Sequence, residues 1–377
     1  MASAPLVSII IPMYNCEKYV DGLADMLSRQ TLGDFEVLCV DDGSTDVTLE
    51  KVRSLCAADE RWTSLVQDHA GAGAARNTGI EKARGTYLMF LDADDEYGEN
   101  LLAELVSAAE ELQADEVFCL FDEYNYKTNV RREGLGFNTG HFPDRTPVET
   151  AGIKDLYRRT PWWCPCVLYR KELVDRYDLR FSTSRVANDE FFMRAYTSAS
   201  KTVVGLHSSL LTYRRYVNDR SLTSSRAQHT EDMISALFSL HVWLCEHGLY
   251  EQHKESFLSY LVNSIRYNGS FPYHTPYVEA VADALCNKGL FDHMSEKDFY
   301  TAYWKRYDTE KMRKKIADLK AQNPADEHEI EAWTNRLATI QGIEKTAKAE
   351  YGRKLDPRGF AERTLKSALA KLKARLR

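Results

Sequence analysis

The sequence predicts an α/β protein, in which a mostly parallel sheet is flanked by helices and followed by an α-helical C-terminal region. Two observations indicate this class. Short apolar, β-branched runs alternate with segments of helical periodicity over the first hundred residues, and strand patterns stop near residue 225. Strands that alternate with helices form parallel sheets with right-handed crossovers, and such sheets bind ligands at the carboxyl ends of their strands.

The first half of the predicted sheet alternates strand and helix. The run from Leu6 to Ile11 is continuous, apolar and β-branched, as expected for a strand buried on both faces, and Pro12 ends it. Similar runs predict strands at residues 35–40 and 64–66 and from Tyr87 onwards. Apolar residues at helical spacing predict intervening helices at 17–30, 49–56 and 74–83.

Beyond the fourth strand the patterns are more varied. Residues 101–113 predict a helix, 116–121 a strand, and the charged, glycine-rich residues 127–140 a loop. An aromatic stretch leads to a predicted helix at 171–176, a further helix begins near residue 188, and short strands are predicted at 203–206 and 210–213. From His229 onwards the chain predicts helices, with breaks near residues 248, 269–276, 289, 323–324 and 356–357.

The composition is that of an ordinary globular protein and argues against two classes. The 377 residues are 44% hydrophobic and 28% charged with a formal net charge of -7, which disfavours a protein that coats nucleic acid. No stretch approaches the roughly 18 apolar residues of a membrane span, and no basic segment with a long apolar run opens the chain, so we expect a cytoplasmic protein. The eight cysteines are scattered, which favours free buried thiols.

The fourth predicted strand ends abruptly in three carboxylates, Asp92, Asp94 and Asp95, with no basic residue among them. Like charges this close repel unless a cation lies between them, and hard carboxylate oxygens suit Mg²⁺ or Mn²⁺. The alternative is a solvated acidic turn after a buried strand.

Polar clusters follow other predicted strands as well. Tyr14 and Asn15 follow the first strand, and Asp41 and Asp42 follow the second. Because the carboxyl ends of parallel strands meet at one edge of a sheet, these clusters and Asp92 should lie together. Their convergence favours a ligand site over a chance acidic turn.

Four motifs occur in one order over the first hundred residues. They are VSIIIPMYN at 7–15, VDDGSTD at 40–46, ARNTGI at 75–80 after Gly71, and FLDADD at 90–95. In residues, order and spacing they resemble the family 2 glycosyltransferases, over the N-terminal two-thirds of the chain. The resemblance implies a GT-A fold, a divalent metal (Mn²⁺ or Mg²⁺), and inverting transfer of a sugar from a nucleotide diphosphate sugar, with a UDP-sugar as the expected donor.

Because strand patterns stop near residue 225, we place a domain boundary at roughly 224–229. We expect a glycosyltransferase domain at 1–225, with a nucleotide-binding part at about 1–125 and an acceptor part at about 126–225, and a helical C-terminal domain at 226–377. Leucines at helical spacing among the basic residues of 354–377 indicate an amphipathic helix on an anionic membrane, here the inner face of the cell membrane. A solvated helix or a contact in a homo-oligomer is the alternative.

The resemblance implies a donor site at the sheet edge. The matching positions are Pro12, Tyr14, Asn15, Asp41, Asp42, Arg76, Asp92 and Arg214. Tyr14 would stack on the nucleobase, Asp41 or Asp42 would accept hydrogen bonds from base or ribose, and Asp92 and Asp94 would hold the metal. Taken alone, Tyr14 also fits a core residue, Asp42 a turn or helix cap, and Arg76 a solvated surface arginine.

An acceptor hydroxyl needs a general base. The segment from Asn188 resembles the family's segment in which an acidic pair precedes a helix, which implies Asp189 as the base. Asn188 stands where the family usually has Glu, so Glu190 is a rival base and a helix N-cap is the other role open to Asp189. Trp162 and Trp163, which have flat faces for sugar rings, are candidate acceptor-binding residues together with Glu190, although packing on the sheet explains the tryptophans equally well.

These observations predict a metal-dependent inverting glycosyltransferase that extends a cell-surface polysaccharide or a lipid-linked glycan precursor. One rival is another nucleotide-dependent α/β enzyme, such as a nucleotidyltransferase or a dehydrogenase, which is weakened because no Gly-x-Gly-x-x-Gly follows the first strand. The other rival is a catalytically degenerate sugar-nucleotide binder, which would explain Asn188. Release of nucleotide diphosphate in the absence of acceptor would separate an enzyme from a binder.

Overall fold

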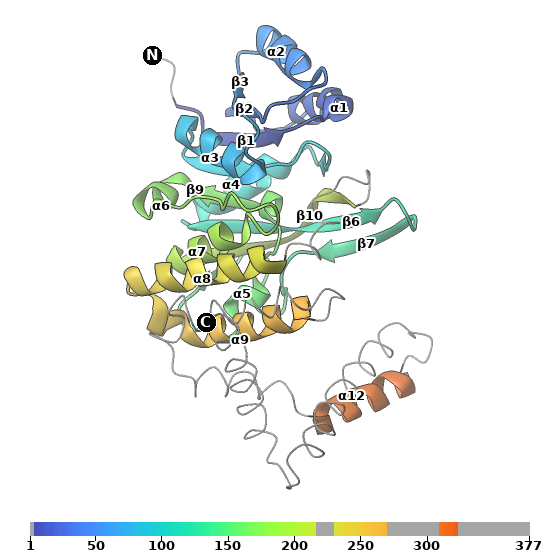
Figure 1. The fold of residues 1–377 in the computed structure, drawn as a ribbon, viewed down its shortest axis with the longest axis vertical. Coiled ribbons are helices and arrows are strands. Elements are labelled where there is room, and N and C mark those ends of the chain that lie inside the picture. Colours follow the sequence, from blue (N-terminus) through green and yellow to red (C-terminus); the bar gives the residue numbers. More distant parts are fainter. Residues whose placement is uncertain (1–3, 216–229, 270–308, 323–377) are drawn as a thin grey trace, which may run out of the picture.

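The computed structural model describes residues 4–215, 230–269 and 309–322. Within these residues a mixed sheet runs through the molecule in the order β3-β2-β1-β4-β9-β6-β10-β5, with β7 paired to β6 and β8 paired to β10 (Figure 1). Helices α1 and α2 lie at one end of this body, and α8 and α9 lie towards the other (Figure 1). The predicted α/β class is confirmed.

The first four strands are parallel and alternate with helices, as predicted. The strands are β1 (Val7–Met13), β2 (Phe35–Asp41), β3 (Trp62–Val66) and β4 (Tyr87–Phe90). The helices are α1 (Glu17–Ser28), α2 (Thr48–Ala58) and α3 (Ala72–Lys82). Every residue of β2 and β4 is buried, which is why these strands are mostly apolar in the sequence; the charged Glu36 within β2 is paired with Arg84.

The second half of the sheet contains both pairings. β6 (Glu116–Asn125) is parallel to β10 (Thr202–Arg215), while β5 (Glu96–Tyr97) and β8 (Pro147–Glu149) are antiparallel to β10. β9 (Val167–Arg170) lies between β4 and β6 and is antiparallel to both. Because of this direction, the start of β9 lies beside the carboxyl end of β4. The aromatic stretch before β9 is thereby brought to the edge that carries Asp92.

Short helices surround this half of the sheet. They are α4 (Leu101–Glu111), α5 (Leu156–Arg159), α6 (Lys171–Arg176) and α7 (Glu190–Ala199), with a 3-10 turn, η1 (Cys164–Cys166), before β9. The helices predicted at 101–113, at 171–176 and from residue 188 are confirmed.

Two element predictions were wrong. Residues 127–140, predicted as a loop, contain β7 (Val130–Leu135), which pairs with β6. β7 is almost wholly exposed and charged, so it lacks the apolar alternation that marks a half-buried strand. The short strands predicted at 203–206 and 210–213 are parts of the single strand β10, and register shifts between Leu206 and Thr212 interrupt its pattern.

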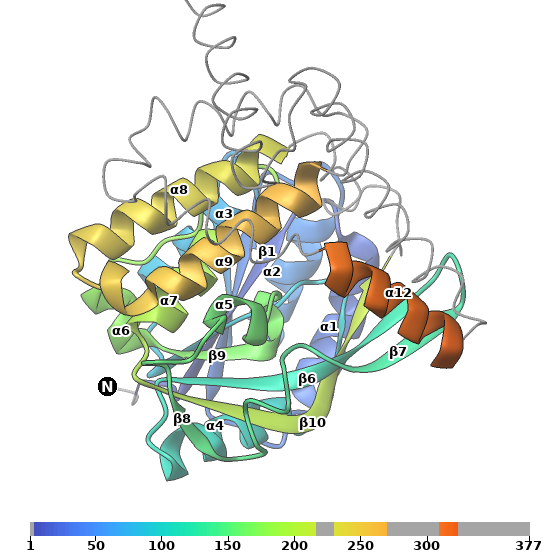
Figure 2. The same ribbon diagram turned by 90° about the horizontal axis from the view of Figure 1, so that it is seen from below.

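Helices α8 and α9 follow the sheet. α8 (Thr230–Glu246) packs against α7, and α9 (Tyr250–Gly269) packs against α8 and α5 (Figure 2). The predicted break near Gly248 is the turn between them, where its φ of +68° suits glycine. Leu240 and Phe257, from these two helices, belong to the same hydrophobic core as the sheet. Helix α12 (Thr309–Gln322) is described as well.

Several expectations fall outside the described residues. These are the domain boundary at 224–229, the breaks beyond Gly269 and the basic tail at 354–377, so the division into two domains stays a prediction. Within the described part, no helix is long and apolar enough to cross a membrane. The seven cysteines in that part are free, as predicted.

Candidate functional site

The carboxyl ends of β2, β1 and β4 are neighbours in the sheet. Met13, next to Pro12, is in register with Asp41, and the Leu91 N–H donates to the Ile10 carbonyl oxygen. The residues that follow these strands therefore share one edge, which we call the strand-end site. It contains Tyr14 and Asn15 after β1, Asp41 and Asp42 at the end of β2, and Asp92 after β4.

Asp42 organises the loop between β3 and α3. Its buried carboxylate accepts the backbone N–H groups of Ala70 and Gly71, both at 2.8 Å, and the side-chain amide of Gln67 at 2.7 Å. Nδ1 of His69 lies 2.9 Å from its Oδ2. Both carboxylate oxygens are thus engaged within the protein, so Asp42 shapes the loop and has little capacity left for a ligand.

Tyr14 and His69 form an aromatic surface at the strand-end site. Their ring centroids are 4.2 Å apart with planes inclined by 29°, and Tyr14 is 47% exposed. The alternative of Tyr14 as a core residue is therefore wrong. An exposed, stacked pair of rings offers a flat face to a planar ligand.

Asp41 is the second buried carboxylate of this site. Its Oδ2 accepts the Ser44 N–H at 3.1 Å, whereas its Oδ1 is buried without a hydrogen-bond partner. Asn15, with φ of +48°, accepts the Thr45 N–H at 2.8 Å and holds the same loop against the end of β1. A buried oxygen without a partner is costly, so Asp41 Oδ1 is suited to accept a hydrogen bond from a bound molecule.

Arg76, on α3, is only 5% exposed and joins separate segments. Its Nη2 donates to Asp92 Oδ1 at 2.7 Å and its Nη1 donates to Asn188 Oδ1 at 2.9 Å. Helix α3 lies close to the segment of Ser182 and Asn188, and this packing requires glycine at residue 73. A Cβ atom there would come within 1.9 Å of the Ser182 carbonyl oxygen. Arg76 is therefore not a solvated surface arginine, and Asn188, which departs from the family pattern, is its hydrogen-bond acceptor.

Two of the carboxylates after β4 have raised pKa values. Burial and the charge of Asp92 raise the pKa of Asp94 to about 6. Burial and the charges of Asp94 and Asp92 raise the pKa of Asp95, whose Oδ1 accepts the Arg214 backbone N–H at 2.8 Å and whose Oδ2 has no partner. The Arg214 side chain donates instead from Nε to the Tyr126 hydroxyl at 3.0 Å. The charges of Arg214 and Lys18 act in the opposite direction on Asp94 and lower its pKa in part.

This cluster fits a divalent cation, because a bound cation would remove the repulsion that raises these pKa values. Among the described residues, no group of three or more His, Cys, Asp or Glu side chains could hold a metal ion. Asp92 and Asp94 are the carboxylates of this cluster that could hold a cation together with phosphates and water. Mg²⁺ commonly binds in this way.

Asp189 lies at the N-terminus of α7, close to Arg76. It occupies the N-cap position, but its side chain makes no capping hydrogen bond, which leaves the N-cap role without support. Burial lowers the pKa of Arg76, but the nearby Cys164, Asp92 and Asp189 together raise it above its usual value. The charge of Asp189 therefore acts on the Arg76 guanidinium, the same group that donates a hydrogen bond to Asp92.

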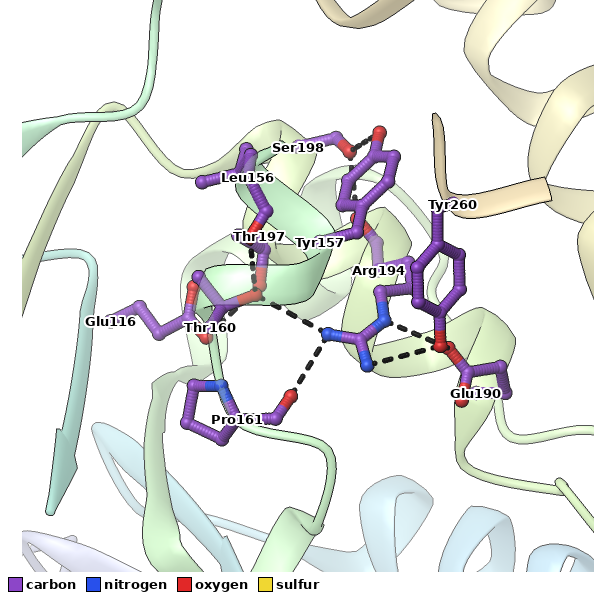
Figure 3. Close-up of polar contacts among 10 residues, drawn as sticks. All are labelled: Glu116, Leu156, Tyr157, Thr160, Pro161, Glu190, Arg194, Thr197, Ser198 and Tyr260. Carbon is purple, nitrogen blue, oxygen red and sulfur yellow. Dashed lines mark hydrogen bonds and ion pairs between the residues drawn. The ribbon is translucent and has the colours of Figure 1, made fainter. Parts of the chain in front are cut away.

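Glu190 has different surroundings from its neighbour. It is 8% exposed, lies 2.7 Å from Nε of Arg194, and accepts the Tyr260 hydroxyl at 2.6 Å (Figure 3). Arg194 itself is almost wholly buried. Glu190 is thus paired with a buried cation, and the two rival bases face different parts of the molecule.

The two candidate tryptophans also differ. Trp163 is 6% exposed and packs against Phe121 and Tyr213, with ring centroids 4.7 Å and 5.0 Å away. Trp162 contacts Phe121 through an edge and is 49% exposed. Trp162 therefore has a ring surface for a ligand, whereas Trp163 has almost none.

His69 and Gln67 are site residues that the sequence reasoning missed. Both follow β3, so the argument from strand ends that singled out Asp41 and Asp92 could have found them. The link between Arg76 and Asn188 has no such signal, because it joins residues far apart in the chain.

Comparisons with known proteins identify the family of the chain. The family model described as glycosyl transferase family 2 matches residues 8–178. The chain is 36% identical over 221 residues to the uncharacterized glycosyltransferase EpsJ of Bacillus subtilis, covering 58% of this chain and 63% of EpsJ. It is 30% identical over 221 residues to the glycosyltransferase GlyG of Streptococcus pneumoniae, covering 56% of this chain and 71% of GlyG.

A solved structure shows the same fold. The crystal structure of Staphylococcus aureus TarS matches with a TM-score of 0.58 at 20% identity, over 78% of this chain and 50% of TarS. This likeness confirms the GT-A fold. The chain spans less than two thirds of EpsJ, but it covers more than that share of GlyG. The family model and the identity to GlyG together establish that the chain belongs to glycosyl transferase family 2.

Proposed function

We propose that the protein is an inverting, metal-dependent glycosyltransferase that moves a sugar from a UDP-sugar to a hydroxyl group of a cell-surface polysaccharide or lipid-linked glycan precursor. The observation that carries the proposal is that Arg76 joins Asp92, at the strand-end site, to the segment that bears Asp189. Two relatives support it. EpsJ and GlyG are named glycosyltransferases.

The choice of a uridine donor rests on TarS. It is named poly(ribitol-phosphate) beta-N-acetylglucosaminyltransferase, and it has been crystallised with UDP and with UDP-GlcNAc. In this chain the exposed stack of Tyr14 on His69 would receive the base. Asp41, whose Oδ1 has no partner, would accept a hydrogen bond from the base or the ribose. Pro12 and Asn15 would shape the pocket, and Arg214 would lie near the diphosphate.

Asp92 and Asp94 would hold a Mn²⁺ or Mg²⁺ ion. Such an ion, when bound, neutralises charge on the departing diphosphate. Arg76 keeps Asp92 in place through their 2.7 Å hydrogen bond. Asp95, anchored to the backbone of Arg214 at 2.8 Å, supports the turn that carries both ligands.

Asp189 is the proposed general base. Its carboxylate would take the proton of the acceptor hydroxyl as the hydroxyl oxygen attacks the anomeric carbon, and the nucleotide diphosphate would leave from the opposite face. Attack opposite the leaving group inverts the anomeric centre. Glu190 is less suited, because its oxygen is already bound by Arg194 and Tyr260.

The departure at Asn188 does not favour a degenerate binder over an enzyme. Its amide oxygen accepts the Arg76 hydrogen bond that ties this segment to the strand-end site. An active enzyme therefore does not need a carboxylate at residue 188 for this contact.

We extend the proposal to an acceptor part at 126–225, to a helical domain at 226–377, and to a peripheral contact of 354–377 with the anionic inner face of the membrane. Co-sedimentation with anionic vesicles, with and without 354–377, tests that contact.

The proposed function is tested by calorimetry and by donor hydrolysis. We expect UDP to bind in the presence of Mn²⁺ or Mg²⁺, and one of a panel of UDP-sugars to be hydrolysed slowly to UDP without acceptor. Thermal unfolding gives a second readout, because a ligand at 100 times its Kd adds about 2.7 kcal/mol of stability. A chain that binds no nucleotide diphosphate with either metal would contradict the proposal.

A further inference from the structure

A groove of about 440 Å³ lies apart from the strand-end site, between the segment after β7, helix α5 and helix α9. The residues that give it chemical character are Phe137, Asn138, Arg158, Trp162, Tyr260 and Asn263. Its size is in the range of about 300–1,000 Å³ that is usual for ligand sites. None of the described residues that line it is an aspartate or a glutamate.

The walls of the groove are joined by one buried guanidinium (Figure 3). Nη1 of Arg194 donates to the Pro161 carbonyl oxygen at 2.9 Å and to the Thr160 hydroxyl at 3.3 Å, and Nη2 donates to the Tyr260 hydroxyl at 3.3 Å. Its Nε pairs with Glu190. Because these partners come from the segment after α5, from α7 and from α9, Arg194 holds the groove in one shape without a ligand.

The same arginine links the groove to the proposed reaction centre. Pro161 directly precedes Trp162, the exposed ring that lines the groove, and Glu190 directly follows Asp189, the proposed base. A molecule that lies along Trp162 therefore reaches the segment next to the carboxylate that would deprotonate it. The groove is therefore connected through Arg194 to Glu190, one residue from the proposed base.

We infer that the groove binds sugar units of the acceptor chain that lie beyond the unit carrying the reacting hydroxyl. The Trp162 ring offers a face for a pyranose ring, while the side chains of Asn138, Asn263 and Arg158 supply hydrogen-bond donors for hydroxyl groups. The absence of lining carboxylates lets the groove accept neutral or acidic sugars alike. The inference rests on the proposed function and specifies its acceptor as an oligosaccharide, with α9 as part of the binding surface.

The experiment uses the full chain and a microarray of bacterial surface oligosaccharides, probed in the presence of UDP and Mn²⁺. Trp162→Ala removes a side chain that is 49% exposed, and Arg158→Ala removes one whose ion pair to Asp155 spans 3.9 Å, so the fold should persist in both variants. Arg176→Ala, on α6, is the matched control, because this exposed arginine also pairs with an acid on its own helix and does not line the groove. UDP affinity is measured by calorimetry for each variant.

We expect the wild-type chain and the Arg176 variant to bind the same oligosaccharides, and both groove variants to bind them about tenfold more weakly or worse, which corresponds to roughly 1.4 kcal/mol. UDP affinity should be equal in all four proteins. Equal oligosaccharide binding by the groove variants, or a wild-type chain that binds UDP but no oligosaccharide, would overturn the inference. Failure of every protein to bind UDP would instead count against the proposed function, while the oligosaccharide result still decides the groove.

Discussion

Arg76 donates a 2.9 Å hydrogen bond from Nη1 to the amide oxygen of Asn188, and so ties helix α3 to the segment that carries Asp189. Both partners are buried. A buried guanidinium that loses an acceptor pays the cost of an unsatisfied charged donor, so this contact should matter for stability as well as for the geometry of the proposed base.

Replacing Asn188 by Ala should therefore lower the free energy of unfolding by about 1–3 kcal/mol. Urea denaturation measures the change. Asn100→Ala is the control, because Asn100 is exposed and accepts only a surface hydroxyl at 3.1 Å from Thr31; it should change the free energy of unfolding by less than about 0.5 kcal/mol. Equal effects of the two substitutions would contradict a special role for the Asn188 contact.

Asp189→Asn should separate catalysis from binding. The amide keeps the size of the carboxylate but cannot take the acceptor's proton, so turnover should fall by roughly 10² to 10⁴ while UDP affinity survives. Glycosyl transfer to a matched acceptor and calorimetry with UDP are the measurements. Turnover close to that of the wild-type enzyme would move the base to another carboxylate.

Glu190→Gln should behave differently, because Glu190 is paired with the buried Arg194. Loss of one partner of a buried ion pair costs roughly 3–5 kcal/mol, and we expect less here because glutamine retains a hydrogen bond. The variant should lose stability, while turnover per folded molecule falls less than in Asp189→Asn. Glu172→Gln, at an exposed pair on α6, is the control for the loss of a surface carboxylate.

Asp94→Ala should abolish the metal-dependent part of UDP binding and leave the fold intact. Asp94 is one of two carboxylates placed to hold the cation, and removal of its charge leaves Asp92 with its bond to Arg76. Calorimetry with and without Mn²⁺, alongside circular dichroism, measures both effects. Asp21→Ala, at an exposed pair with Lys51, should change neither. UDP affinity that is undiminished in excess chelator would exclude a metal role.

Tyr14→Ala should weaken the binding of UDP by about 1–3 kcal/mol, the usual contribution of stacking a base on an aromatic ring. Inorganic diphosphate, which has no base, is the internal control, and its affinity should not change. Isothermal titration calorimetry with UDP and with inorganic diphosphate measures both affinities. A similar loss for both would show that the substitution disturbs the loop around His69 rather than a stacking surface.

Glu116 makes stability depend on pH. Burial raises its pKa from 4.5 to about 8, although the Thr197 hydroxyl donates to Oε1 at 3.1 Å, and Oε2 has no partner. Between about pH 4.5 and 8 the folded chain holds a proton that the unfolded chain has lost, so this residue makes stability fall as pH rises, by up to about 1.4 kcal/mol per unit.

Glu116→Gln should remove this dependence. The variant should match the wild-type chain most nearly at pH 4.5 and gain stability relative to it up to pH 8, as measured by urea denaturation across that range. A constant difference between the two proteins would contradict the raised pKa.

The alternation of strands and helices, and the acids after β2 and β4, could be predicted because they depend on local patterns. A strand buried on both faces is predominantly apolar, and the carboxyl ends of parallel strands share an edge. These two constraints act within short windows of sequence. They predict that Asp41 and Asp92 lie on one edge of the sheet, without knowledge of any other contact.

The partners of the charged side chains were decided by the tertiary structure. Asp41 and Asp42 are adjacent and chemically identical, yet Asp42 is engaged by the loop before α3 and Asp41 keeps one oxygen without a partner. Asp189 and Glu190 are likewise adjacent acids, yet Glu190 is directed towards Arg194 and Tyr260, whereas the charge of Asp189 acts on Arg76. Periodicity cannot report such differences, since each depends on which distant segment packs against one side of a single residue.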